Sequence, residues 1–211
     1  LRELSGGKPV GFKLCIGHKY EFMAICKAMV ETGILPDFIT VDGAEGGTGA
    51  APVEYSNRFG VPCIEATYFV HNCLRGIGLR DKIRIISAGK TSSGFEMVRK
   101  VAVGADLVNA ARTMMLSLGC IQSQSCNTNR CPTGIATQDP VRGKALDIDA
   151  RHIRVANFQR NTLKVFFEMV GAMGLDDPAK LVPHHIWCRV SNETTLHFDE
   201  VYPSVAPHAP R

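Results

Sequence analysis

The sequence predicts an α/β fold built on a parallel β-sheet. Four short apolar runs alternate with segments of helical periodicity, a rhythm typical of parallel strands joined by helical crossovers. The apolar runs lack a clean two-residue alternation, so we expect both faces of the sheet to be covered. Four units in 211 residues leave two architectures open, a doubly wound sheet or the second half of a (β/α)₈ barrel, because a whole barrel typically needs roughly 250 residues.

The first unit is a strand over residues 10–14 followed by a helix over residues 18–32. Gly33 ends this helix, because glycine readily adopts the left-handed conformation at a helix C-terminus. The next strand covers residues 37–42 and leads into a glycine-rich loop. The apolar face of the helix consists of Phe22, Ile25, Cys26, Met29 and Val30.

The second helix is expected over residues 68–79, and the third strand over residues 83–86. Ser93 and Glu96 have the spacing of a capping box, in which a serine side chain and a glutamate three residues later satisfy the first backbone N–H groups of a helix. We therefore expect a third helix that begins at Ser93 and ends near residue 103.

A fourth strand over residues 105–110 leads directly into a helix over residues 112–118. The pattern then changes to a polar segment and a long helix over residues 153–173. Prolines punctuate the end of the chain, so we expect residues 191–211 to form a loose tail. The inward face of the long helix is predicted to carry Val155, Phe158, Val165, Phe166, Met169 and Val170.

The composition is that of an ordinary globular chain. Hydrophobic residues make up 45% and charged residues 21%, which excludes disorder over the whole length. No apolar run reaches the about 18 residues of a membrane span. The formal net charge of +4 suits a phosphate-bearing ligand, and no lysine–arginine stripe indicates nucleic-acid binding. Because no signal peptide opens the sequence, we expect a cytoplasmic protein.

A glycine-rich loop over residues 43–49 directly follows the second strand. Its four glycines allow the backbone to approach a ligand and to point N–H groups at it. The spacing differs from the dinucleotide-binding fingerprint. A flexible loop is the alternative, and the position at the carboxyl end of a strand favours a ligand site.

Two later strand ends resemble phosphate sites. In TIM barrels the loops after the last two strands commonly bind phosphate. Gly89 gives backbone access after the third strand, and Ala111 and Arg112 open a helix after the fourth. A solvated helix start explains Arg112 equally well on this feature alone.

Lys13 lies within the first strand, between Phe12 and Leu14. A strand lysine among buried neighbours needs a partner. The pyrimidine edge of a flavin, which becomes anionic on reduction, would supply one. The alternative is an edge-strand lysine that reaches solvent.

The sharpest motif is Cys120-x5-Cys126-x4-Cys131-Pro132. Without a secretory signal, a disulfide framework is the weaker interpretation of the eight cysteines, and the other five read as small core residues. Three thiolates in one loop can each bind one iron of an iron–sulfur cluster. A zinc site is the second interpretation of the three cysteines, although zinc usually needs a fourth ligand. Three unligated thiols are the third alternative.

These motifs together resemble the FMN-binding central domain of glutamate synthases, especially the short archaeal-type proteins. The matching strings cover residues 12–14, 43–52, 119–126 and 131–138, and the resemblance extends over about residues 8–190. It implies a (β/α)₈ barrel of which this chain holds the last four units, in residues 1–119. An iron–sulfur loop then follows at 120–138 and a helical segment at 139–190.

The resemblance also implies a reaction, in which reduced FMN converts 2-iminoglutarate, made from 2-oxoglutarate and ammonia, to L-glutamate. Electrons would enter through a 3Fe-4S cluster, supplied by ferredoxin or an NAD(P)H-linked reductase subunit. An amidotransferase subunit would deliver ammonia, and the N-terminal half of the barrel would complete the site. Two other functions stay open: a related enzyme of N-methylglutamate synthase type, and a non-catalytic electron-transfer module.

Carried onto this sequence, the resemblance gives each motif a role. Lys13 would contact the flavin and the oxoacid, and Glu45 is a proton-relay candidate. The remaining implied contacts are Gly46, Gly47 and Thr48 along the flavin ring, Gly89, Ala111 and Arg112 at the phosphate, and Cys120, Cys126 and Cys131 at the cluster. The sequence departs from the large enzymes at the turn before the phosphate, where they have Asp-Gly-Gly and this chain has Ala88-Gly89-Lys90. We therefore expect the contacts to the phosphate to be rearranged.

Overall fold

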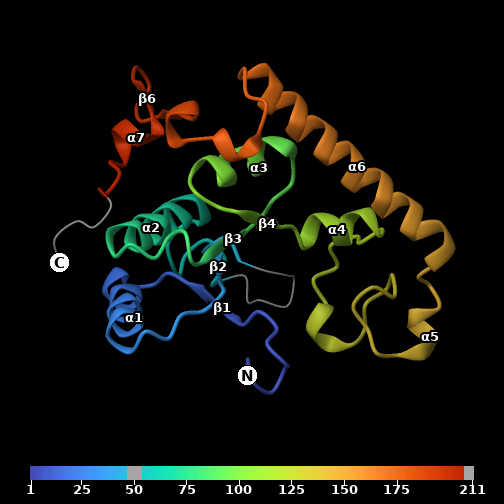
Figure 1. The fold of residues 1–211 in the computed structure, drawn as a ribbon. Helices are drawn as coiled ribbons and strands as arrows, with labels where there is room; N and C mark the ends of the chain where they lie inside the picture. The colour runs from blue at the N-terminus through green and yellow to red at the C-terminus, as the bar shows by residue number, and fades with distance from the viewer. Residues whose placement is uncertain (47–53, 207–211) are drawn as a thin grey trace.

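Four parallel strands form the central sheet, and their order in space, β1-β2-β3-β4, is their order in the sequence. The computed structural model describes residues 1–46 and 54–206. The strands are β1 (Gly11–Cys15), β2 (Phe38–Asp42), β3 (Arg84–Ala88) and β4 (Leu107–Asn109) (Figure 1). Each lies within two residues of the predicted start, so the parallel α/β fold is confirmed.

The crossover helices begin and end where local signals can be identified. Helix α1 (Lys19–Thr32) ends at Gly33, which has the predicted left-handed conformation with φ of 68°. Helix α3 (Gly94–Ala102) begins after Ser93, whose hydroxyl accepts a hydrogen bond from the Glu96 N–H. This is one half of the predicted capping box, and the Glu96 carboxylate instead pairs with Arg99 at 3.1 Å. Helix α4 (Arg112–Ser117) follows β4 after two residues.

Two helices begin five residues before their predicted starts. Helix α2 (Cys63–Gly76) starts directly after Pro62, where its apolar face already contributes Cys63 and Ile64 to the core. The long helix α6 (Ile148–Ala172) starts after Asp147, whose carboxylate accepts a hydrogen bond from the Ala150 N–H.

In residues 1–46 and 54–206 the helices cover only one face of the sheet. Ile39, Val41 and Ile85 on that face are fully buried beneath α1 and α2. On the opposite face Lys13 and Leu107, on the two outer strands, are exposed, whereas Thr40 on the inner strand β2 is 6% exposed. The prediction that both faces are covered is therefore wrong, and the open face is the one that would line the interior of a barrel.

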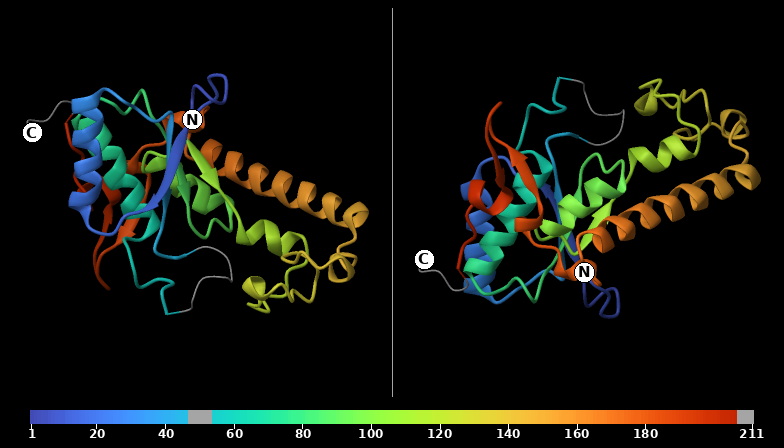
Figure 2. Two further views of the ribbon diagram at one scale, coloured as in Figure 1. Left: turned by 90° about the horizontal axis from the view of Figure 1, so that it is seen from below. Right: turned by 90° about the horizontal axis from the view of Figure 1, so that it is seen from above.

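Helix α6 packs against α3 and α4 and extends well beyond the sheet (Figure 2). Of its predicted inward residues only Phe166 and Val170 are buried, whereas Val165 is 40% exposed. The 120–147 segment, which includes α5 (Pro140–Gly143), lies beside the half of α6 that is farther from the sheet (Figure 2). The short 3₁₀ turns of the chain are Cys126–Thr128, Pro178–Lys180 and Pro183–His185.

Residues 195–201, within the segment expected to be a loose tail, form regular secondary structure. Strands β5 (Trp187–Arg189) and β6 (Thr195–His197) form an antiparallel pair, and α7 (Phe198–Val201) follows. Phe198 is 2% exposed and packs edge-on against Tyr68 of α2. In the described residues no helix is long and apolar enough to cross a membrane.

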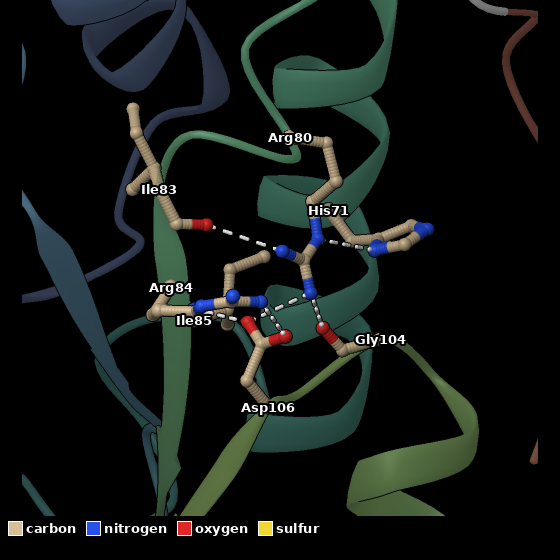
Figure 3. Close-up of polar contacts among 7 residues, drawn as sticks. All are labelled: His71, Arg80, Ile83, Arg84, Ile85, Gly104 and Asp106. Atoms are coloured by element: carbon tan, nitrogen blue, oxygen red, sulfur yellow. Dashed lines mark hydrogen bonds and ion pairs between the residues drawn. The ribbon is translucent and has the colours of Figure 1, made fainter. Parts of the chain in front are cut away.

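A polar cluster joins the amino ends of β3 and β4 to α2 (Figure 3). The Arg80 guanidinium donates to His71 Nδ1, to the carbonyl oxygens of Ile83 and Gly104, and to Asp106 Oδ2, at 2.8–3.1 Å. The second bond that fixes Asp106 comes from the Ile85 N–H at 2.7 Å. One arginine thus ties three segments of the chain together.

Burial next to Arg80 lowers the pKa of His71 from 6.5 to about 4. The unfolded chain therefore takes up a proton at His71 between pH 6.5 and 4, while the folded chain does not. Folding stability is unaffected above pH 6.5 and should fall as pH decreases through this window, by about 3 kcal/mol at pH 4. Denaturant unfolding at pH 7, 5.5 and 4.5 measures this loss of stability. In His71→Gln the free energy of unfolding should fall less steeply with decreasing pH, because one fewer proton is taken up on unfolding. If the free energy of unfolding of His71→Gln fell with pH as steeply as that of the unmodified protein, His71 would not be the group responsible.

Candidate functional site

A cavity of about 120 Å³ lies at the carboxyl ends of the four parallel strands. It is lined mainly by residues from the strand ends and from the loops that follow them. Five residues proposed for the site from the sequence lie on its wall: Lys13, Gly46, Gly89, Ala111 and Arg112. Gly47 and Thr48, which were predicted to lie beside them, fall outside the described residues.

Lys13 has a partner that the sequence did not reveal. Its ammonium lies 2.6 Å from the Asp42 carboxylate, which ends the neighbouring strand β2. The Lys13 side chain is 59% exposed and β1 is the first strand of the sheet order, so in the described residues Lys13 is an edge-strand lysine that reaches solvent, the alternative that the sequence left open. In strand register Asp42 lies opposite Cys15, two residues after Lys13, and both charges therefore lie on the open face.

Glu45 is placed at the start of helix α2. Its two carboxylate oxygens accept hydrogen bonds of 2.9 and 3.0 Å from the Cys63 N–H. A carboxylate at a helix N-terminus satisfies an otherwise unpaired donor and interacts favourably with the helix dipole. Glu45 thus connects the loop after β2 to α2, and its role as a proton relay stays a prediction.

The turn after β3 contains a non-glycine residue with a positive φ. Lys90 has φ of 38°, and its ammonium donates to Asn57 Oδ1 at 3.0 Å. Left-handed backbone is unfavourable for a residue with a Cβ atom unless surrounding contacts hold it. The turn after β3 therefore depends on the contacts of its neighbours.

Lys100 of α3 contacts the turn after β3. It was not identified as a site residue from the sequence. It is 1% exposed, and its ammonium donates to the Gly89 carbonyl oxygen and to Thr91 Oγ1. Burial lowers the pKa of Lys100. Neither the helical periodicity nor any motif marks this position, because a lysine on a short amphipathic helix normally faces solvent.

Arg112 begins a helix of only six residues. A helix this short has only a small dipole at its N-terminus. Thr113 in the first turn donates to the Thr91 carbonyl oxygen at 2.5 Å and thereby anchors α4 to the turn after β3.

The predicted cluster cysteines are only partly brought together. Cys120 and Cys126 line a small cavity of about 40 Å³ together with Arg112, which places them next to the strand-end cavity. Cys131 is buried away from it, and hydrogen bonds from Thr133 and from backbone N–H groups lower its pKa to about 7. Across residues 1–46 and 54–206, no three His, Cys, Asp or Glu side chains converge on a possible metal position.

The family described as the conserved region in glutamate synthase matches residues 1–176. Among curated relatives, the glutamate synthase large subunit-like protein YerD of Bacillus subtilis is 38% identical over 196 residues, covering 93% of this chain and 37% of its own length. An archaeal glutamate synthase [NADPH] of Archaeoglobus fulgidus is 36% identical over 169 residues, covering 80% of this chain and 32% of its own length.

Solved structures show the same fold at low sequence identity. A flavocytochrome b2 mutant with pyruvate bound has a TM-score of 0.52 at 13% identity and covers 86% of this chain and 35% of its own. A second, with benzoylformate, has a TM-score of 0.51 at 12% identity and covers 91% and 41%. The likeness fits a partial β/α barrel, in agreement with the one-sided sheet. The chain spans about a third of the length of the curated relatives it matches, and the family match over 176 of its residues shows that it belongs to the glutamate synthase family.

Proposed function

We propose that this chain is the second half of the FMN-binding barrel of a glutamate synthase-type oxidoreductase, which reduces 2-iminoglutarate, formed from 2-oxoglutarate and ammonia, to L-glutamate. The observation that carries the proposal is the cavity at the strand ends, where Lys13, Gly89 and Arg112 meet although they are far apart in the sequence. Residues 1–119 would form the barrel half, residues 120–138 the cluster loop and residues 139–190 the helical cover.

The residues of the cavity fit FMN at both of its charged ends. Arg112 and Thr113 lie on the same wall as the backbone of Gly89 and Lys90, a donor set that suits a phosphate dianion. Lys13 and Asp42 lie on the wall formed by β1 and β2, where the ring system would extend. When bound, FMN would supply the two-electron reduction of the imine carbon.

The side chains of this chain would then bind and orient. Lys13, whose ammonium lies 2.6 Å from the Asp42 carboxylate, would donate hydrogen bonds to an anionic ring edge or to a substrate carboxylate. Gly46 and Gly89 would let the backbone approach the flavin closely. Arg112 would hold the phosphate and so fix the position of the ring relative to Lys13.

Replacing Arg112 with alanine should weaken FMN binding by roughly 2 kcal/mol, or about thirtyfold in Kd, because one charge-assisted contact to the phosphate is lost. Riboflavin has the same ring and no phosphate, so its affinity should hardly change. Flavin fluorescence titration of the full-length protein measures both affinities. Arg154→Ala, an exposed arginine on α6, is the matched control. Absence of any FMN preference over riboflavin in the unmodified protein would refute the proposed cofactor.

We also propose an iron–sulfur cluster on Cys120, Cys126 and Cys131. Their spacing and the proline that follows the last of them support it. The described conformation does not gather the three thiols around one point, so the loop would have to close around a cluster on loading. The proximity of Cys120 and Cys126 to Arg112 would then place that cluster beside the flavin site.

Protein purified without oxygen should contain iron and acid-labile sulfide in similar amounts, and Ser replacement of any one of the three cysteines should abolish both. Cys188→Ser, in strand β5, is the control and should leave the metal content unchanged. Stoichiometric zinc without sulfide would exclude the cluster.

The partners follow from the proposed reaction. An electron donor, either ferredoxin or an NAD(P)H-linked subunit, and an ammonia-supplying amidotransferase would act with the chain, and an N-terminal barrel half would pair with the sheet edges at β1 and β4. We propose a cytoplasmic location, which the eight free cysteines support because thiols stay reduced in that compartment.

A further inference from the structure

Lys100 is a buried cation directly behind the turn that lines the strand-end cavity. It is one of the largest fully buried side chains of the described structure. Its ammonium donates to the Gly89 carbonyl oxygen and, at 2.5 Å, to Thr91 Oγ1. Both acceptors are neutral oxygens, and the carboxylates of Glu96 and Glu45 act on the ammonium through space. Removing such a charge from water is costly, which indicates that the position does more than fill space.

Thr91 connects Lys100 to the other walls of the cavity. Its hydroxyl donates to the Asn109 carbonyl oxygen at the end of β4, at 3.0 Å. Its own carbonyl oxygen accepts the hydrogen bond from Thr113 in the first turn of α4. Through this one residue, Lys100 fixes the turn after β3 relative to β4 and to the helix that carries Arg112.

The contact with Gly89 also determines where the next N–H group points. No cis peptide bond occurs in the described parts of the chain, and the C=O and N–H of a trans peptide point in opposite directions. Because the Gly89 carbonyl is directed inward to Lys100, the Lys90 N–H is directed outward. Gly89, Lys90 and Thr91 all line the cavity, so this donor faces the space where a phosphate would lie.

The same contact explains how Lys90 keeps its left-handed backbone with φ of 38°. A residue with a Cβ atom holds this conformation only when neighbouring contacts determine it. Lys100 holds the Gly89–Lys90 peptide through the Gly89 carbonyl oxygen, and Asn57 Oδ1 accepts a hydrogen bond from the Lys90 ammonium.

We propose that Lys100 is a positioning residue for phosphate binding, which holds the Gly89–Lys90 peptide with its N–H toward the cavity and places a positive charge behind it. The inference rests on the proposed FMN function and concerns only the phosphate end of the cofactor. Lys100 does not line the cavity, so it acts through the turn and through its field rather than by contact.

The test compares FMN with riboflavin in the full-length protein, by flavin fluorescence titration. Lys100→Met keeps the length and the apolar stem of the side chain and removes the charge and the donors. We expect FMN affinity to fall at least tenfold while riboflavin affinity stays within twofold. Lys164→Met, an exposed lysine of α6, should leave both affinities unchanged.

Lys100→Gln separates orientation from charge, because the amide can still donate to Gly89 and Thr91 but carries no charge. We expect its preference for FMN over riboflavin to lie between those of Lys100→Met and the unmodified protein. An unchanged preference in Lys100→Met would overturn the inference. Equal loss of both affinities would also overturn it, because it would reveal a general effect on the fold. Absence of the preference in the unmodified protein would instead reject the FMN site itself.

Discussion

Replacing Arg80 with alanine is expected to destabilise the fold by about 3–5 kcal/mol, the range measured when one partner of a buried ion pair is removed. The guanidinium is 15% exposed and makes four contacts, to His71, to two backbone carbonyl oxygens and to Asp106 (Figure 3). Its loss leaves a mostly buried carboxylate with only the Ile85 N–H and the distant Arg84. Because these groups join α2, β3 and β4, the whole sheet edge should loosen.

Chemical denaturation followed by circular dichroism measures this effect. Arg84→Ala provides a matched control, since Arg84 contacts the same carboxylate at 3.4 Å but is 66% exposed. Its loss should cost no more than about 1 kcal/mol, as for other exposed ion pairs. Equal destabilisation by the two substitutions would contradict the central role assigned to Arg80.

Gly43→Ala should destabilise the protein by about 3 kcal/mol, at the upper end of the range for overpacking. A Cβ atom at this position would overlap Glu45 Oε2 and would lie 2.5 Å from Cys63 Cβ and 2.7 Å from Cys63 Cα. The glutamate could move away, but the backbone at the start of α2 could not. The substitution should also displace the Glu45 carboxylate from the Cys63 N–H and so weaken the start of the helix.

Thermal unfolding of Gly43→Ala and Gly17→Ala provides the comparison. Gly17 lies just after β1, and the nearest atom to an added Cβ there is Glu21 Oε2 at 3.5 Å, an ordinary contact. Gly17→Ala should therefore change stability by about 0.5 kcal/mol or less. A normal melting temperature for Gly43→Ala would show that α2 can shift to accommodate the methyl group.

The arrangement of strands and helices was predictable because its signals are local. Gly33 and Ser93 mark helix ends through their own backbone and side-chain chemistry, and both predictions are confirmed. The start of α2 was predicted too late because part of its capping comes from Glu45, eighteen residues earlier in the chain. Such a contact exists only after the loop and the helix have met in the fold.

The residues of the candidate site also fall into two groups, those that the sequence could identify and those that depend on contacts made in the folded structure. Gly89 and Arg112 could be selected because strand ends of a parallel sheet converge at one edge, and Lys13 because a lysine within a strand needs a partner. The structure places all three on one cavity. Asp42 and Lys100 could not be selected in the same way. The role of Asp42 depends on the register between β1 and β2, and that of Lys100 depends on α3 packing directly beneath the turn after β3.

The sheet order β1-β2-β3-β4 has a consequence for how the chain folds during synthesis. Strands β2, β3 and β4 each pair with the strand made just before them, so each of these units can dock as soon as it leaves the ribosome. Contacts between neighbouring units close short loops and form quickly. The cavity, by contrast, needs Arg112 and Thr113 as well as Lys13, so it is completed only after β4 and α4 are added to a largely assembled sheet. Cofactor capture would accordingly be a late event in folding and would not be needed to form the first three units.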